Sequence, residues 1–128
     1  MRKKSLISIC VALVLCLCLG FSTFSYAGSY YGSNLQINVS DNSASTRVFT
    51  SNTTYISARM DVRVYVLNAV TGTGYHYTQT VTKPMTKTRS LTCRYDEPST
   101  YFTIYTFEYA IGRGTIDGSQ IGPVTVAS

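Results

Sequence analysis

YISARMDVRVYVL, residues 55–67, is the stretch that decides the expected fold. Apolar side chains alternate with polar or charged ones throughout it. A period of two places the apolar set on one face of a β-strand and the other set on the opposite face, whereas a helix would scatter both sets around its axis. We therefore predict a half-buried strand in an antiparallel sheet. Its inward-facing residues are Ile56, Ala58, Met60, Val62, Val64 and Val66.

Extended segments rich in threonine and tyrosine lie on both sides of this strand, separated by turn-forming glycine and proline. They predict strands at 35–39, 46–50, 75–82, 86–95, 100–111 and 115–126, with hairpin turns at 71–74 and 112–114. Lys83-Pro84 is expected to separate two of these strands, since proline cannot donate a ladder hydrogen bond. About seven strands with turns at about every 8 to 12 residues predict an all-β, antiparallel β-sandwich of immunoglobulin-like topology. A small barrel fits the same spacing.

Residues 1–27 have the three-part pattern of a secretory signal peptide. Three basic residues at 2–4 precede an apolar run from Leu6 to Gly20, and the small residues Ser25 and Ala27 suit a signal peptidase. We expect a signal helix, cleavage after Ala27 and secretion of the rest. The alternative is an uncleaved membrane anchor, but an apolar helix of 15 residues spans only about 22 Å of a hydrocarbon core of about 30 Å.

Removal of the signal changes the composition of the remaining domain, residues 28–128. Three of the four cysteines leave with it, so Cys93 has no intramolecular disulfide partner. Eight basic residues then stand against six acidic ones, a net charge of +2 instead of +5. This weak charge, without a run of lysine or arginine, gives no reason to expect nucleic acid as a partner. The membrane is expected as a partner only through an uncleaved signal.

Cys93 and His76 are the strongest nucleophile and the neutral-pH base of the domain, so a small hydrolase that uses them is one alternative function. Cys93 shares its strand face with Leu91 and Tyr95, which favours a buried, inert thiol. An exposed Cys93 would instead be able to form an intermolecular disulfide. Because the thiol is expected to be buried and inert, we assign no catalytic residue. One cysteine and one histidine are too few for a structural zinc site, so we assign no metal or cofactor.

Tyrosines are the candidate binding residues, because a phenol ring offers a flat apolar face together with a polar hydroxyl. Strand parity places Tyr101, Tyr105 and Tyr109 on one face with Phe107, and Tyr75 and Tyr77 on another. Such rings can stack on sugars or contact a protein, and cross-strand pairing within the core is the alternative explanation. Whether they are buried or lie beside a groove is the open question.

In layout the chain resembles small uncharacterised secreted β proteins of Clostridia-like Gram-positive bacteria. The resemblance lies in a signal peptide followed by about 100 residues rich in threonine, serine and tyrosine, with glycine hairpins. It implies export from a bacterium and no particular active site. We expect a non-enzymatic binding module at the cell envelope, with a cell-wall glycan or a surface protein as partner. A bacteriocin-like antimicrobial protein and the small hydrolase that uses Cys93 or His76 are the two alternatives to this binding module.

Overall fold

The computed structural model describes residues 25–128, with side chains from Gly28 onward, and the predicted signal helix lies almost wholly outside this range. The described chain is all β, without a helix. Its seven strands are β1 (Ser25–Ala27), β2 (Ser29–Tyr31), β3 (Leu35–Val39), β4 (Ser43–Asn68), β5 (Gly74–Asp96), β6 (Thr103–Ile116) and β7 (Ser119–Ala127). Within residues 25–128 there is no apolar helix of the length needed to cross a bilayer.

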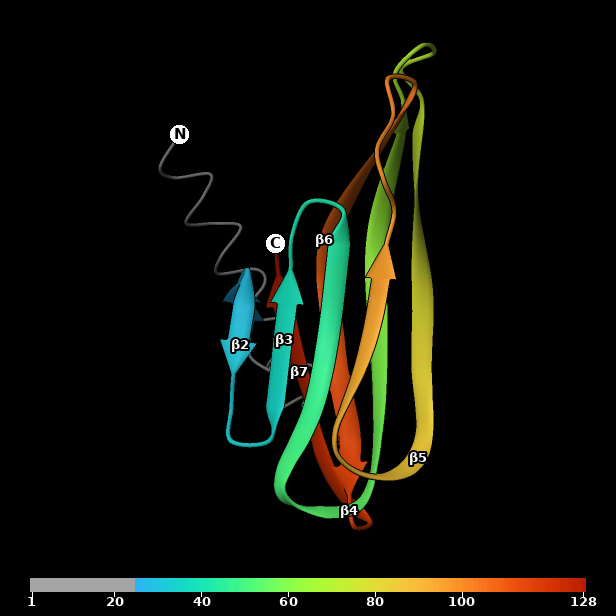
Figure 1. Cartoon of the computed structure of the whole chain (residues 1–128). Coiled ribbons are helices and arrows are strands. Elements are labelled where there is room, and N and C mark those ends of the chain that lie inside the picture. Colours follow the sequence, from blue (N-terminus) through green and yellow to red (C-terminus); the bar gives the residue numbers. More distant parts are fainter. Residues whose placement is uncertain (1–24) are drawn as a thin grey trace, which may run out of the picture.

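All strands are hydrogen-bonded into a single sheet that curls into a half-barrel (Figure 1). The order is β1-β7-β6-β4-β3-β2, with β5 also paired to β4, and every pairing except β1 with β7 is antiparallel. The prediction of an all-β antiparallel fold is therefore confirmed. The immunoglobulin-like sandwich stays a prediction, because one continuous sheet carries both facing layers.

The curl produces two layers that face each other. One layer contains β2, β3, the first part of β4 and the last part of β5, and we call it the facing layer; the other contains the later part of β4, the first part of β5, β6 and β7. The long β4–β5 hairpin thus contributes to both layers. The first part of β4 pairs with β3, and its later part, from Ile56, pairs with β6. Register shifts between Phe49 and Thr54 and between Ile56 and Ala58 mark the bend, as expected of bulges that increase local twist. The sequence predicted breaks in both strands, and these predictions were wrong.

Pro84 does not interrupt β5, because β5 pairs with β4 alone and its other edge is free of partners among the described residues. Proline is tolerated on an edge strand, where its missing donor leaves no central ladder bond unmade. Lys83, Pro84, Lys87 and Arg89 also make this edge unsuitable for pairing with another chain.

The core lies between the two layers and confirms the pattern from which the fold was predicted. All six inward residues of the 55–67 stretch are at most 4% exposed. They pack against β3, the first part of β4 and Phe107 of β6. Among the residues whose side chains are described, 28–128, every buried core residue lies between Leu35 and Val126.

Gly112 and Gly114 lie inside β6, so the predicted hairpin turn at 112–114 was wrong. A Cβ atom at Gly112 would meet the side chains of Ile37 and Thr46, which shows that the facing layer approaches this strand closely. The turn lies instead at Asp117 and Gly118, with φ of 50° and 82°. Two residues with positive φ make the tight connection between β6 and β7 that twisted strands favour.

One end of the sheet extends beyond the facing layer as a narrow projection, which we call the finger (Figure 1). It comprises residues 64–68 of β4, 74–77 of β5 and 103–106 of β6, with the loops at 69–73 and 97–102. The facing layer ends where Asp41 O accepts a hydrogen bond from Phe107 N at 2.7 Å. β6 continues past this point for four residues, roughly 13 Å.

Candidate functional site

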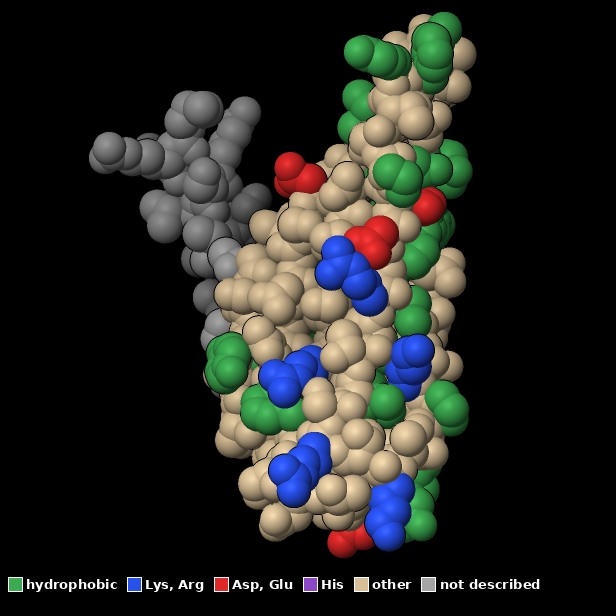
Figure 2. Space-filling view, in the orientation of Figure 1, with side chains coloured by type: hydrophobic (Ala, Val, Ile, Leu, Met, Phe, Trp, Pro, Cys, Tyr) green, Lys and Arg blue, Asp and Glu red, His purple; other side chains and the backbone are tan. Residues whose placement is uncertain are grey.

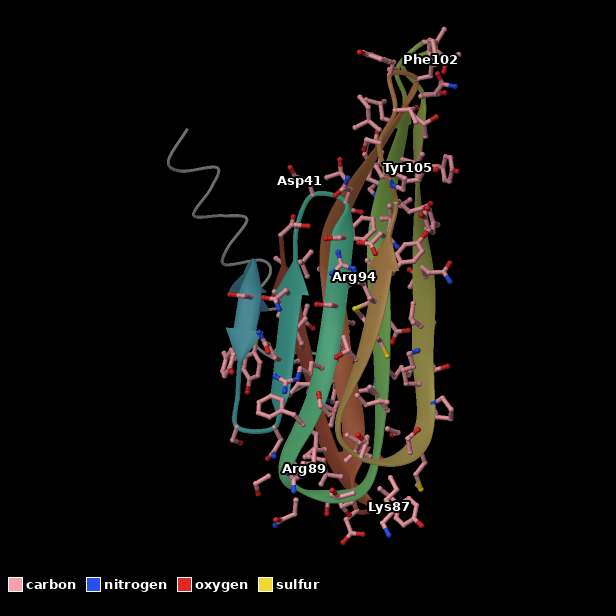
Figure 3. All side chains as sticks on the ribbon, in the orientation of Figure 1. Asp41, Lys87, Arg89, Arg94, Phe102 and Tyr105 are labelled. Carbon is pink, nitrogen blue, oxygen red and sulfur yellow. The ribbon has the colours of Figure 1, made fainter. Side chains whose placement is uncertain are left out.

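A solvent-open hollow of about 290 Å³ lies at the base of the finger, where the facing layer ends. It is lined by four tyrosines and one carboxylate: Tyr75, Tyr77, Tyr95, Tyr105 and Glu97. The phenol oxygens of Tyr77 and Tyr95 are 2.8 Å apart, and the Tyr77 hydroxyl donates to Glu97 Oε2 at 3.3 Å. Figure 3 labels Tyr105, at the base of the finger.

Strand register explains why three of these rings share the concave face. Val66 of β4 pairs with Tyr75 on one side and with Tyr105 on the other, and paired residues in an antiparallel ladder point to the same face. Tyr77 occupies the equivalent position beside Val64. The hollow is thus the continuation of the core face past the point where the facing layer stops covering it.

Tyr95 and Glu97 come from the opposite layer, and the sequence did not identify either as a site residue. Tyr95 pairs with Ala44 and stacks on Phe107, with ring centroids 5.5 Å apart and planes at 12°. The signal available was its parity with Cys93, which predicts an inward-facing ring. The contact between Tyr95 and Tyr77 depends on the bend of the β4–β5 hairpin. The alternation of residues along a single strand does not predict this bend.

The hollow raises the pKa of three of its phenols, those of Tyr77, Tyr95 and Tyr105. Burial, followed by the hydrogen bond with Tyr95 and the negative charge of Glu97, raises the pKa of Tyr77 far above the ordinary value. Burial also raises the pKa of Tyr95 and of Tyr105. The site therefore presents neutral hydroxyls, able to donate and accept hydrogen bonds, beside a carboxylate that accepts them.

Of the five tyrosines predicted as binding residues, Tyr75, Tyr77 and Tyr105 meet at the hollow and the other two do not. Tyr101 lies in the loop at the end of the finger and is 94% exposed. Tyr109 pairs with Arg63, whereas Phe107 pairs with Val64, so Glu108 is an extra residue in β6. This bulge turns Tyr109 to the convex face, and the predicted face shared by Tyr109 with Tyr105 and Phe107 was wrong.

Cys93 and His76 lie on opposite faces of the sheet. Cys93 is fully buried beside its cross-strand partner Thr46, and burial raises the pKa of its thiol, which confirms the prediction of a buried thiol. His76 is exposed on the convex face, where its Nδ1 lies 2.6 Å from Glu108 Oε1. The structure therefore does not bring this nucleophile and this base together.

Three arginines on the outer face of β4 and β6, Arg59, Arg63 and Arg113, lie beside carboxylates. Asp61 lies 3.5 Å from Arg59 Nη2 and 3.1 Å from Arg113 Nη2, and it accepts a hydrogen bond from Thr80. Arg63 lies 3.8 Å from Glu108. The two carboxylates offset two of the three arginine charges, which leaves the tyrosine-lined hollow as the better candidate site.

The described residues contain no group of three or more histidine, cysteine, aspartate or glutamate side chains that could hold a metal ion. Comparison with known protein families, with curated proteins and with solved structures finds no match. The chemistry of the hollow therefore carries the functional argument.

Proposed function

We propose that this protein is a secreted, non-enzymatic binding module of the cell envelope, and that the tyrosine-lined hollow binds a cell-wall glycan. The observation that carries the proposal is the hydrogen-bonded chain of Tyr77, Tyr95 and Glu97 inside an open hollow. Aromatic faces suit the apolar C–H faces of a sugar ring, while the hydroxyls and the carboxylate suit its hydroxyl groups.

The shape and charge of the hollow narrow the ligand class. Its openness suits one or two units of a longer polymer better than an enclosed small molecule. Glu97 is the one charged residue among those that line it, so a neutral or amino-bearing sugar fits better than an anionic polymer.

Secretion and the immunoglobulin-like architecture belong to the same proposal. Secretion is supported by the basic, apolar and small-residue regions of residues 1–27. The sandwich-like architecture is supported by the close approach of Ile37 and Val48 in one layer to Gly112 and Gly114 in the other.

Binding of residues 28–128 to insoluble peptidoglycan, measured by co-sedimentation, tests the proposal. Tyr75 is 62% exposed, so Tyr75→Ala removes a ring from the hollow without opening the core. We expect it to weaken binding about five- to tenfold. The matched control is Tyr55→Ala, since Tyr55 is 51% exposed, lies outside the hollow and pairs with Lys87 at the opposite end of the sheet (Figure 3).

Two results would overturn the proposal. The first is the absence of retention on peptidoglycan by the unaltered domain. The second is equal loss of binding in the Tyr75 and Tyr55 variants, which would show that exposed aromatic rings in general, and not the hollow, hold the polymer.

A further inference from the structure

The end of the finger is exposed and free of charge, and its largest side chains are apolar or aromatic. Its two loops present Val70 at 71%, Tyr101 at 94% and Phe102 at 65% exposure. Residues 64–75 and 98–107 contain no aspartate, glutamate, lysine, arginine or histidine. Figure 2 shows hydrophobic side chains gathered on this projection, and Figure 3 labels Phe102 there. We call these three residues the finger tip. None of them lines the tyrosine hollow.

The two loops are held side by side, and their backbone groups are well supplied with partners. Ala69 N donates to Phe102 O at 2.9 Å. In one loop Asn68 Oδ1 accepts from Val70 N and Thr71 N, and in the other Thr100 Oγ1 accepts from Phe102 N and Thr103 N. Backbone N–H groups that already have a partner lower the free-energy cost of moving the two loops out of water, because an unpaired amide is strongly unfavourable in an apolar medium.

The shape of the finger tip fits a bilayer better than a protein. Stable protein interfaces use about 20 to 30 residues on each side, and a narrow convex projection with three large apolar side chains offers far fewer. A bilayer needs no matching pocket and accepts a convex apolar point. The Tyr101 hydroxyl beside the apolar Val70 and Phe102 also suits the boundary between headgroups and acyl chains.

We propose that the finger tip inserts into the interfacial region of a lipid bilayer, with Val70 and Phe102 in contact with acyl chains and Tyr101 at headgroup level. This second surface is independent of the glycan-binding proposal, because it uses different residues. It also differs from the sequence-based expectation that a membrane would be contacted only through an uncleaved signal.

The charges behind the finger tip indicate the kind of bilayer. Asp41, Asp96, Glu97 and Glu108 lie around the base of the finger, with Arg63 and Arg94 as the neighbouring cations. Four acids against two arginines would repel an anionic surface once insertion of the tip brings that surface within about 10 Å of them. The tip therefore favours zwitterionic lipid. Lys87 and Arg89, at the opposite end, would instead favour anionic lipid (Figure 3).

A tryptophan reporter tests insertion directly, because the sequence contains no tryptophan. Phe102→Trp in residues 28–128 is mixed with phosphatidylcholine vesicles. We expect its emission to shift to shorter wavelength and to be quenched by brominated acyl chains. Val70→Ser and Tyr101→Ser, added to this background, are expected to raise the lipid concentration at half-maximal shift roughly tenfold.

The matched control is Met85→Trp, since Met85 is 62% exposed but lies on β5 next to Lys83 and Lys87. We expect no shift and no quenching at this position. If truncation prevents folding, the same two reporters are compared in the full-length chain, where both share residues 1–27. Equal shifts at positions 102 and 85, or no shift at position 102, would overturn the proposal.

Two further results would also overturn it. Stronger binding as phosphatidylglycerol replaces phosphatidylcholine would identify the basic end as the membrane contact. A blue shift at position 102 that grows with protein concentration in the absence of vesicles would identify the tip as a surface for self-association.

Discussion

Thr46 is a fully buried polar residue of β4, and its hydroxyl has no hydrogen-bond partner among the described residues. It sits beside its cross-strand partner Cys93 and close to Gly112 of β6, in the opposite layer. A buried hydroxyl without a partner has lost its hydrogen bonds to water and gained none in return. The unpaired hydroxyl therefore lowers the free energy of unfolding, and a nearly isosteric substitution that removes the hydroxyl restores this loss.

We expect Thr46→Val to raise the free energy of unfolding by about 1 kcal/mol, since a methyl group replaces the unpaired hydroxyl at similar volume. Urea denaturation followed by circular dichroism measures the change. Thr46→Ser is the control, because it keeps the hydroxyl and deletes the methyl group, and it should lower stability. A valine variant less stable than the parent would contradict the assignment of an unpaired hydroxyl.

The phenols of the hollow predict a loss of stability in alkali. Burial, the Tyr77–Tyr95 hydrogen bond and Glu97 raise the folded-state pKa of Tyr77, and burial raises that of Tyr95, above the ordinary value of 10.0. This contribution is fully present below about pH 10 and is lost as the pH rises towards the folded-state pKa, because unfolded phenols ionise first.

Thermal unfolding checks this prediction. It is measured from pH 8 to pH 11, a range that begins below the phenol pKa of about 10 and ends above it. We expect a fall in Tm above about pH 10 that is smaller in Tyr77→Phe, which cannot ionise at that position. Tyrosinate absorbance should show late-titrating groups that this variant loses. Identical alkaline profiles for the parent and the variant would contradict the coupling between Tyr77 and its neighbours.

At the scale of the element, the glycines of β6 set the spacing between layers and between neighbouring strands. A Cβ atom at Gly114 would clash with the backbone oxygen of Ser57 on β4, which cannot move without breaking the ladder. At Gly112 the added atom would lie 2.6 Å from Ile37 Cδ1 and 2.7 Å from Thr46 Oγ1, which belong to side chains and not to the hydrogen-bonded backbone of a neighbouring strand.

Gly114→Ala is therefore expected to lower the free energy of unfolding by about 3 kcal/mol, and Gly112→Ala by about 1 kcal/mol. Chemical denaturation of both variants measures their free energies of unfolding. It compares a clash with the backbone of β4 at position 114 with a clash with core side chains at position 112. The reverse order of stabilities, or no effect of Gly114→Ala, would show that the β4–β6 spacing adjusts to a methyl group.

Strand faces were predictable within an element wherever the period of two was unbroken. The 55–67 stretch placed six core residues correctly, because every inward position from 56 to 66 is apolar, whereas the outward positions 57, 59, 61 and 63 are polar or charged. The prediction failed at Tyr109, since the single extra residue at Glu108 reverses the parity of everything after it. A bulge depends on pairing with another strand, and a local pattern does not contain that information.

At the scale of the whole molecule, the described core is built by residues of strands β3 to β7. Among residues 28–128 the core residues lie between Leu35 and Val126, and the backbone of β1 pairs in parallel with residues 125–127 of β7. Residues 28–128 should therefore fold with the same sheet as residues 25–128. We expect the loss of β1 to lower the free energy of unfolding by at most about 2 kcal/mol.

Circular dichroism and urea titration of the two chains measure this difference. A dispersed amide spectrum from residues 28–128 would further establish a fixed tertiary structure. An unfolded 28–128 chain beside a folded 25–128 chain would show that β1 is essential to closure of the sheet, and it would argue against cleavage after Ala27.

The sequence by itself determined the all-β class, the inward face of residues 55–67, the buried thiol and the tyrosines from which a site is built. These properties follow from side-chain polarity and the two-residue period of a strand, which act locally. Only the tertiary structure decided that β4 and β5 form one bent hairpin, that Tyr77 meets Tyr95 and Glu97, and that an uncharged tip projects beyond the facing layer. Bulges, register and the approach of the two layers decide these, and they depend on contacts between residues far apart in the chain.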